Sequence, residues 1–92
     1  MDYTTRRWRK KRVSILRRDK YQCQISKRYG KLVEADTVHH IYPAQEFPQY
    51  AFCSWNLISI CKQEHNKLHI RNTQKLSKYG LELQRKTKIP PS

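Results

Sequence analysis

Acidic residues are scarce in this 92-residue chain: seven Asp and Glu stand against 20 Lys and Arg, which leaves a formal net charge of +13. A small chain can hold that much like charge only if most of it is solvated or neutralised by an anionic partner. No apolar run approaches the roughly 20 residues of a transmembrane helix, and neither a secretory signal nor a membrane-binding amphipathic helix is evident. We therefore expect a soluble, intracellular protein with nucleic acid, not a membrane, as its partner.

Cysteine is also sparse. Cys23, Cys53 and Cys61 form an odd, widely spaced set, which is typical of free thiols in a reducing compartment and argues against a disulfide framework. A chain of this length forms one domain, residues 1–92, and buries only about 60–65% of its unfolded surface. Its hydrophobic core is therefore expected to be small.

The N-terminal region predicts a basic helix from Thr4 to about Arg18, because Trp8, Ile15 and Leu16 recur near one face. Basic residues cover the rest of the helix, and no acid within it offsets their repulsion. We expect phosphate contacts in preference to a merely solvated face. The residues expected to make them are Arg6, Arg7, Arg9, Lys10, Arg17 and Arg18.

Residues 21–41 predict short extended pieces, with a strand at 37–41 and Leu32-Val33 as its hairpin partner. Pro43 and Pro48 then predict an irregular loop, which aromatic side chains keep ordered. Further on, the pattern predicts a helix from about Lys62 to Ile70.

A final short helix is expected after these elements. Asn72-Thr73 is its predicted cap, and Leu76, Tyr79 and Leu83 are spaced for packing. Gly80 is expected to weaken or break it.

The four histidines lie in two tight clusters, His39-His40 and His65-x-x-x-His69, with Asn56 between them. Adjacent residues of an extended segment point to opposite faces, whereas an i, i+4 pair on a helix shares one face. One member of the first pair can therefore join the second pair around a cation. The other is left free to handle a proton.

This arrangement resembles the HNH endonuclease family with its ββα-metal motif. Val38-His39-His40-Ile41 resembles the first strand signature, and the segments at 56–61 and 65–69 resemble the second half. The resemblance covers roughly residues 21–70. It implies an α+β fold, a ββα-metal core with a basic N-terminal helix and a short C-terminal helix, similar to small phage-encoded members.

The same resemblance implies metal-dependent hydrolysis of phosphodiester bonds in double-stranded DNA, by nicking or cutting. It makes His39, His65 and His69 ligands of one divalent ion, which is Mg²⁺, Mn²⁺, Ni²⁺ or Zn²⁺, and His40 the general base. The alternative is that His39 is the base. Asn56 is expected to hydrogen-bond across the loop through its amide and so to hold the strand of His40 against the helix, the alternative being an ordinary turn or cap residue.

The family resemblance also suggests a bacterial or phage-infected host cytoplasm and phage DNA-processing machinery as the setting. Many family members carry two Cys-x-x-Cys knuckles around a structural zinc. Here Cys23-Gln24-Ile25-Ser26 and Cys61-Lys62-Gln63-Glu64 retain half of the thiolates, so a structural zinc is not expected. Cys23 and Cys61 are expected to pack as small buried hydrophobes.

Two other functions fit the charge. One is a non-catalytic nucleic-acid-binding module that keeps the ββα fold and uses the ion only for folding. The other is a basic ribosome-associated protein, which would have no reason to cluster its histidines. The sequence does not specify a DNA sequence preference, the physiological metal, nicking or double-strand cutting, or the oligomeric state.

Overall fold

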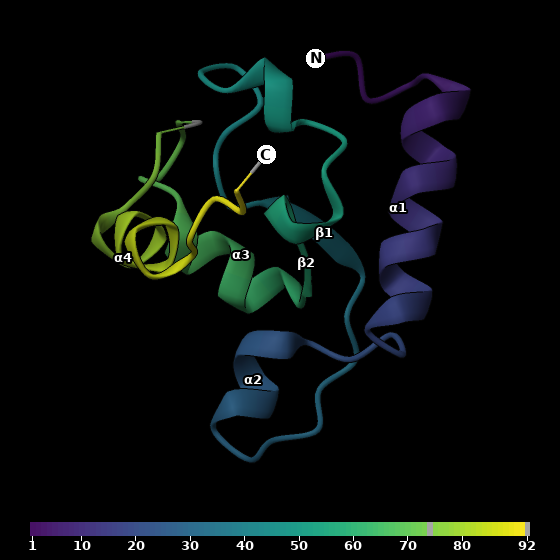
Figure 1. The fold of residues 1–92 in the computed structure, drawn as a ribbon. Helices are drawn as coiled ribbons and strands as arrows, with labels where there is room; N and C mark the ends of the chain where they lie inside the picture. Colours follow the sequence, from purple (N-terminus) through teal and green to yellow (C-terminus); the bar gives the residue numbers. More distant parts are fainter. Residues whose placement is uncertain (74, 92) are drawn as a thin grey trace.

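The computed structural model describes residues 1–73 and 75–91. It is a small α+β fold, as the sequence predicts, with a two-stranded sheet at its centre (Figure 1). The elements in chain order are α1 (Arg6–Arg18), α2 (Gln24–Arg28), β1 (Thr37–His40), η1 (Pro48–Tyr50), η2 (Ser54–Asn56), β2 (Leu57–Ile60), α3 (Lys62–Leu68) and α4 (Lys78–Lys86), where η marks a 3-10 helix. Among the described residues, no helix has the length and apolar character needed to cross a membrane.

The central sheet pairs β1 with β2 in antiparallel orientation. The prediction that Leu32-Val33 is the partner of β1 is therefore wrong. Leu32 is 83% exposed, and the carbonyl of Val33 accepts a hydrogen bond from the Cys23 amide instead. All four residues of β2 are buried, because helices cover both faces of this narrow sheet.

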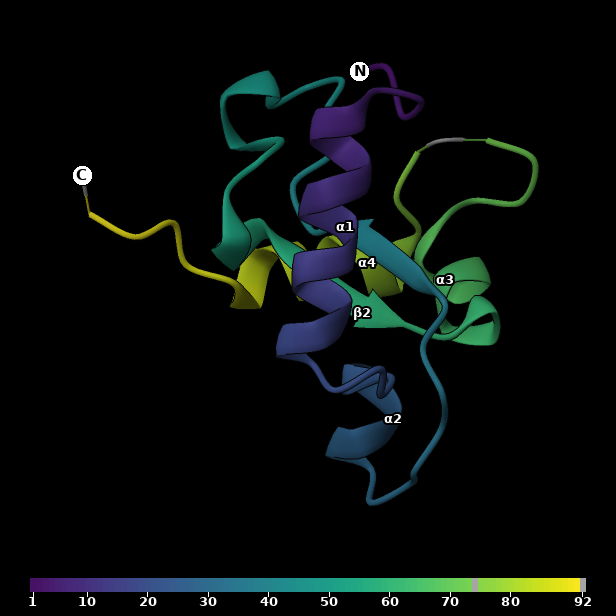
Figure 2. The ribbon, with the colours of Figure 1, turned by 90° about the vertical axis from the view of Figure 1, so that its right-hand side faces the viewer.

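Helix α1 lies across one face of the sheet, and α3 and α4 lie on the other side (Figures 1 and 2). The predicted inner face is confirmed, since Trp8, Ile15 and Leu16 are all buried. The helix begins two residues later than predicted. Its N-cap is Thr5, whose hydroxyl accepts a hydrogen bond from the Trp8 amide at 3.2 Å.

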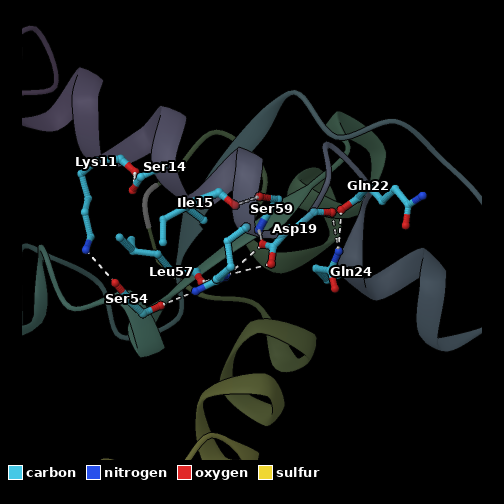
Figure 3. Close-up of polar contacts among 10 residues, drawn as sticks. Lys11, Ser14, Ile15, Asp19, Gln22, Gln24, Ser54, Leu57 and Ser59 are labelled. Carbon is cyan, nitrogen blue, oxygen red and sulfur yellow. Dashed lines mark hydrogen bonds and ion pairs between the residues drawn. The ribbon is translucent and has the colours of Figure 1, made fainter.

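The C-terminal end of α1 is fixed to β2 by polar contacts (Figure 3). The Asp19 carboxylate accepts a hydrogen bond from the Ser59 amide at 3.0 Å, and the Ser59 hydroxyl donates to the Ile15 carbonyl at 3.4 Å. The Arg18 guanidinium donates to the Leu57 carbonyl at 2.7 Å. These contacts hold the helix at a fixed angle to the strand that faces it.

The segment between α1 and β1 contains a short helix, α2, where only extended pieces were predicted. Five residues are too few to show a helical period in the sequence. Cys23 precedes α2 and Cys61 precedes α3, and both thiols are buried in the core as predicted. The Ser26 hydroxyl donates to the Cys23 sulfur at 3.3 Å.

The loop from β1 to β2 is ordered by aromatic packing, as predicted. The ring of Tyr42 contacts the rings of Phe47, Tyr50 and Trp55 edge to face, with centroid distances of 5.2–5.9 Å. Phe52 packs elsewhere, against Trp8 on α1. The loop therefore has a small core of its own beside the sheet.

The last helix differs from the prediction in its start and in the role of its glycine. Ser77, not Asn72-Thr73, is the N-cap of α4, because the Ser77 hydroxyl accepts a hydrogen bond from the Gly80 amide. Gly80 does not break the helix. A Cβ at this position would lie 2.3 Å from the Leu68 carbonyl oxygen, so glycine lets α4 approach the end of α3 closely.

Candidate active site

The two adjacent histidines of β1 point to opposite faces of the sheet, as the strand period requires. In the antiparallel register His39 faces Ile58 and His40 faces Leu57. His39 lies on the side of α3, where its ring contacts the rings of His65 and His69. His40 lies on the side of α1, where its ring contacts Trp8. Both side chains are buried, with 2% and 8% of their surface exposed.

Three imidazoles meet on the α3 side. The ligand nitrogens of His39, His65 and His69 all lie within 4.8 Å of one another. The Nε2 atoms of His65 and His69 are 3.1 Å apart. His65 lies in the last turn of α3, and His69 is the C-cap residue that follows this helix. The structure thus brings one histidine of the first cluster to both histidines of the second.

Within this three-histidine cluster, the environment favours the neutral imidazole at His39 and at His65. Burial, together with the neighbouring imidazoles, lowers the pKa of His39 to about 3. Burial and His69 also lower the pKa of His65. The buried Nε2 atom of His39 has no hydrogen-bond partner among residues 1–73 and 75–91. A neutral imidazole with an unpaired buried nitrogen is the form that binds a metal ion.

The donor set fits a divalent cation. Two nitrogens bound to one ion at about 2.0–2.1 Å lie at most about 4.2 Å apart, so small side-chain rotations would close the cluster on an ion. The ion would also satisfy the unpaired Nε2 of His39. Three protein ligands leave coordination positions for substrate or water, which is typical of catalytic sites and not of structural ones.

His40 is held apart from this cluster. Its Nε2 lies 3.0 Å from the Ala51 carbonyl oxygen. A carbonyl only accepts hydrogen bonds, so Nε2 carries the proton and the Nδ1 atom of the neutral ring is the free base. Burial lowers the pKa of His40, and the hydrogen bond to Ala51 offsets part of this effect. The ring is therefore neutral at physiological pH.

Aromatic rings fix the plane of the His40 imidazole. The Trp8 indole stacks on it with a centroid distance of 4.9 Å and an interplanar angle of 20°. The ring of Tyr3 approaches both His40 and Trp8 edge to face, at 6.0 and 5.6 Å. These contacts come from α1 and from the segment that precedes it.

Asn56 is fully buried and makes three side-chain hydrogen bonds. Its Oδ1 accepts from the Tyr42 amide at 2.6 Å, and its Nδ2 donates to the carbonyls of Tyr42 and Tyr50 at 3.0 and 3.1 Å. All three bonds run across the loop between the strands, as expected, and none of the three reaches α3. They fix the residues around His40 from both ends of that loop.

A cleft of about 840 Å³ gives access to the site. All four histidines line it, together with Tyr3, Pro43, Ala44, Gln45, Glu46 and Lys75. The strand therefore presents two histidines from opposite faces to one opening. Lys75 adds a basic residue to the lining of the same opening.

The basic residues of α1 fall into two groups. Arg6, Arg9, Lys10 and Arg17 are exposed and follow the i, i+3, i+4 spacing of one helix face. Arg18 is different, because it donates to the Ser54 and Leu57 carbonyls and pairs with Asp19. The Arg7 guanidinium stacks on the Phe52 ring at 3.7 Å from its centroid.

Sequence reasoning did not identify Trp8, Ala51 or Lys75 as parts of the site. Trp8 was expected only in the core, which is also correct. Ala51 acts through its backbone carbonyl, for which the side chain gives no signal. Lys75 is one of 20 basic residues, and only the tertiary fold brings it to the cleft.

Comparisons with known proteins give one informative similarity. No protein-family model matches the chain. No curated protein matches it either. Among solved structures, it is similar to the crystal structure of the HNH endonuclease of the deep-sea thermophilic bacteriophage GVE2 with a manganese ion. The TM-score is 0.68 at 33% sequence identity, and the match covers 70% of each chain.

Proposed function

Because the chain belongs to the HNH endonuclease family, we propose that it is a metal-dependent endonuclease that hydrolyses phosphodiester bonds of double-stranded DNA. The observation that carries this proposal is the separation of the four histidines into a three-histidine cluster and one hydrogen-bonded, neutral imidazole. The three-histidine cluster is suited to binding a divalent ion, and the single imidazole is suited to accepting a proton. Both line the same cleft.

In this proposal His39, His65 and His69 hold one divalent ion. When bound, the ion supplies positive charge that stabilises the phosphate and the leaving 3′-oxygen in the transition state. Manganese in the similar phage endonuclease makes Mn²⁺ a suitable first probe, beside Mg²⁺, Ni²⁺ and Zn²⁺.

His40 is proposed to be the general base. Its Nδ1 accepts a proton from a water molecule as the water oxygen forms a bond to phosphorus. The phosphorus–O3′ bond breaks, and the 3′-oxygen leaves with a proton from solvent. The Ala51 carbonyl accepts a hydrogen bond from the Nε2–H of His40 throughout, and so stabilises the imidazolium that forms on this ring.

Asn56 is proposed to act through the backbone. Its amide fixes Tyr42 and Tyr50, and Tyr50 is the neighbour of Ala51, whose carbonyl orients His40. The proposed role is therefore to keep the base at its place, with no contact to substrate.

The exposed face of α1 is proposed to bind the DNA backbone. Arg6, Arg9, Lys10 and Arg17 are free to meet phosphates, and Arg7 presents its guanidinium beside Phe52. The Arg18 guanidinium is instead hydrogen-bonded within the protein, to the carbonyls of Ser54 and Leu57. The phage source of the similar endonuclease supports phage DNA processing as the setting.

Cleavage of a supercoiled plasmid tests the proposal. Purified protein with Mg²⁺, Mn²⁺ or Ni²⁺ is expected to convert the plasmid to open-circular or linear DNA, and a chelator is expected to stop the reaction. His40→Ala should reduce cleavage by about 100-fold or more, within the range for loss of a general base. Gln49→Ala, which changes an exposed side chain of η1, is the matched control.

Two results would contradict the proposal. If no metal supports cleavage while the protein binds DNA, the chain is a non-catalytic binding module. If His40→Ala cleaves at the wild-type rate, the imidazole of His40 is not the base.

A further inference from the structure

We infer that Trp8 is a positioning residue for His40, and that helix α1 thereby carries both a part of the active site and the proposed DNA-binding face. This inference rests on the proposed function. It goes beyond it by assigning a role to a residue outside the histidine–asparagine constellation. The indole ring does not touch the reacting atoms, so its effect passes through the imidazole plane.

The argument starts from the freedom that His40 would have without Trp8. Its hydrogen bond to the Ala51 carbonyl fixes the position of one ring nitrogen, Nε2. A single hydrogen bond still allows the ring to rotate about the line that joins Cβ to Nε2. This rotation changes the direction in which Nδ1 points. A second restraint is needed to aim Nδ1 at one point in the cleft.

The Trp8 indole supplies this second restraint. It lies nearly parallel to the imidazole, 20° between planes with centroids 4.9 Å apart, and only 4% of Trp8 is exposed. A close-packed neighbour of this size leaves little room for the smaller ring to tilt. Tyr3 closes the arrangement edge to face against both rings. One bond and one stacked face together define the imidazole orientation.

Trp8 lies among the basic residues of α1, so its contact with His40 links the active site to the proposed DNA-binding helix. Arg7 and Arg9 flank Trp8, and Lys10 follows two residues later. The helix is anchored to the body of the protein by Lys11, which donates to the Ser54 hydroxyl, and by Arg12, which donates to the Asp36 carbonyl. The element proposed to bind DNA is thus rigidly connected to the imidazole proposed to activate water.

Two substitutions separate orientation from packing. Trp8→Phe keeps a flat aromatic face over His40, whereas Trp8→Leu keeps an apolar side chain but no flat face. Leu16→Ala, on the same buried side of α1, is the control for loss of stability alone. All variants are compared at a temperature at which circular dichroism shows them folded.

For plasmid cleavage with Mn²⁺, Trp8→Leu is expected to lower kcat by about 10- to 100-fold with little change in KM, because misplacement of a catalytic group by about 1 Å costs rate on this scale. Trp8→Phe should recover most of kcat. Leu16→Ala should lower the unfolding midpoint and leave kcat within about twofold. Equal kcat in Trp8→Leu and wild type would overturn the inference, as would equal losses in Leu16→Ala and Trp8→Leu.

A second measurement does not depend on activity. Nitrogen NMR of the histidine side chains is expected to show His40 in a single tautomer, with the proton on Nε2 and ring protons shifted upfield by the indole. Trp8→Leu should lose the upfield shift and show averaged ring signals, and Trp8→Phe should retain part of the shift. Loss of the upfield shift without averaging of the His40 ring signals in Trp8→Leu would refute positioning, because the ring would then keep its orientation without the indole. A wild-type protein that shows the expected signals but never cleaves DNA would instead refute the proposed function.

Discussion

The side-chain amide of Asn56 forms a reciprocal pair of hydrogen bonds with the backbone of Tyr42, accepting from its amide and donating to its carbonyl. The same amide also donates to the carbonyl of Tyr50. One buried side chain therefore joins the two ends of the loop that closes the hairpin. His40 lies two residues before Tyr42, and Ala51 directly follows Tyr50.

Asn56→Ala is expected to lower stability and cleavage together, with a smaller effect on Mn²⁺ affinity. The substitution leaves the amide and the carbonyl of Tyr42 without partners among the described residues, at a cost of about 1–3 kcal/mol each before relaxation. The Tyr50 carbonyl keeps its hydrogen bond from the Cys53 amide. Urea unfolding, plasmid cleavage and calorimetry measure the three effects, with Gln49→Ala as control. Wild-type cleavage by Asn56→Ala, or loss of ion binding with cleavage retained, would contradict the role given to Asn56.

Glutamine replacements of Arg6, Arg9, Lys10 and Arg17 are expected to weaken DNA binding and reduce its salt dependence. For every phosphate that the variant no longer neutralises, the slope of log K against log[salt] should decrease by about 0.9. Fluorescence anisotropy in chelator measures binding without cleavage. A control variant with glutamine at Lys78, Arg85, Lys86 and Lys88 removes the same charge from the α4 region. Equal slopes in the two variants would mean that α1 does not face DNA.

Gly80→Ala is expected to destabilise the fold by about 1–3 kcal/mol, the usual range for overpacking. Alanine alone would favour the helix by about 1 kcal/mol, but its Cβ would lie 2.3 Å from the Leu68 carbonyl oxygen. Leu81→Ala, at a position 55% exposed in the same helix, should change stability little. A Gly80→Ala variant that unfolds at a higher urea concentration than wild type would show that α4 does not pack so closely.

Asp19 is expected to contribute to acid sensitivity. Burial raises the pKa of its carboxyl, but hydrogen bonds from Arg18 and Ser59 outweigh burial and lower it below 3.8 (Figure 3). The folded state thus binds this proton less tightly than the unfolded state. The resulting stabilisation is fully present above pH 3.8 and is lost as the pH falls through the lowered pKa.

Urea unfolding of wild type and Asp19→Asn, at pH values above and below 3.8, tests how much the Asp19 carboxylate stabilises the fold. The difference in unfolding free energy should be largest above pH 3.8 and should narrow at lower pH. Glu34→Gln, which changes an exposed carboxylate, is the control. A difference that stays constant with pH would show that the Asp19 charge does not carry the effect.

Local patterns made α1, α3 and the histidine groups predictable. The 3.6-residue period places Trp8, Ile15 and Leu16 on one face, and the strand period alone sends His39 and His40 to opposite sides. Each of these conclusions needs only neighbouring residues. This is why the three-histidine cluster could be anticipated before any tertiary contact was known.

The features that the sequence did not reveal depend on distant contacts. The partner of β1 is β2, beyond a loop of 16 residues, while Leu32-Val33 was nearer in sequence. Gly80 was interpreted by its helix propensity, but its position is set by the Leu68 carbonyl. The stacking of Trp8 on His40 joins α1 to β1 and has no local signature.

Mn²⁺ titration by calorimetry of wild type and the four single His→Ala variants tests the central claim most directly. We predict one site per chain in wild type and in His40→Ala, and loss of that site in His39→Ala and His65→Ala, with His69→Ala at least weakened. His40→Ala should bind the ion and fail to cleave DNA. Wild-type ion binding by His39→Ala, or loss of the ion in His40→Ala, would contradict the division of the histidines into ligands and base.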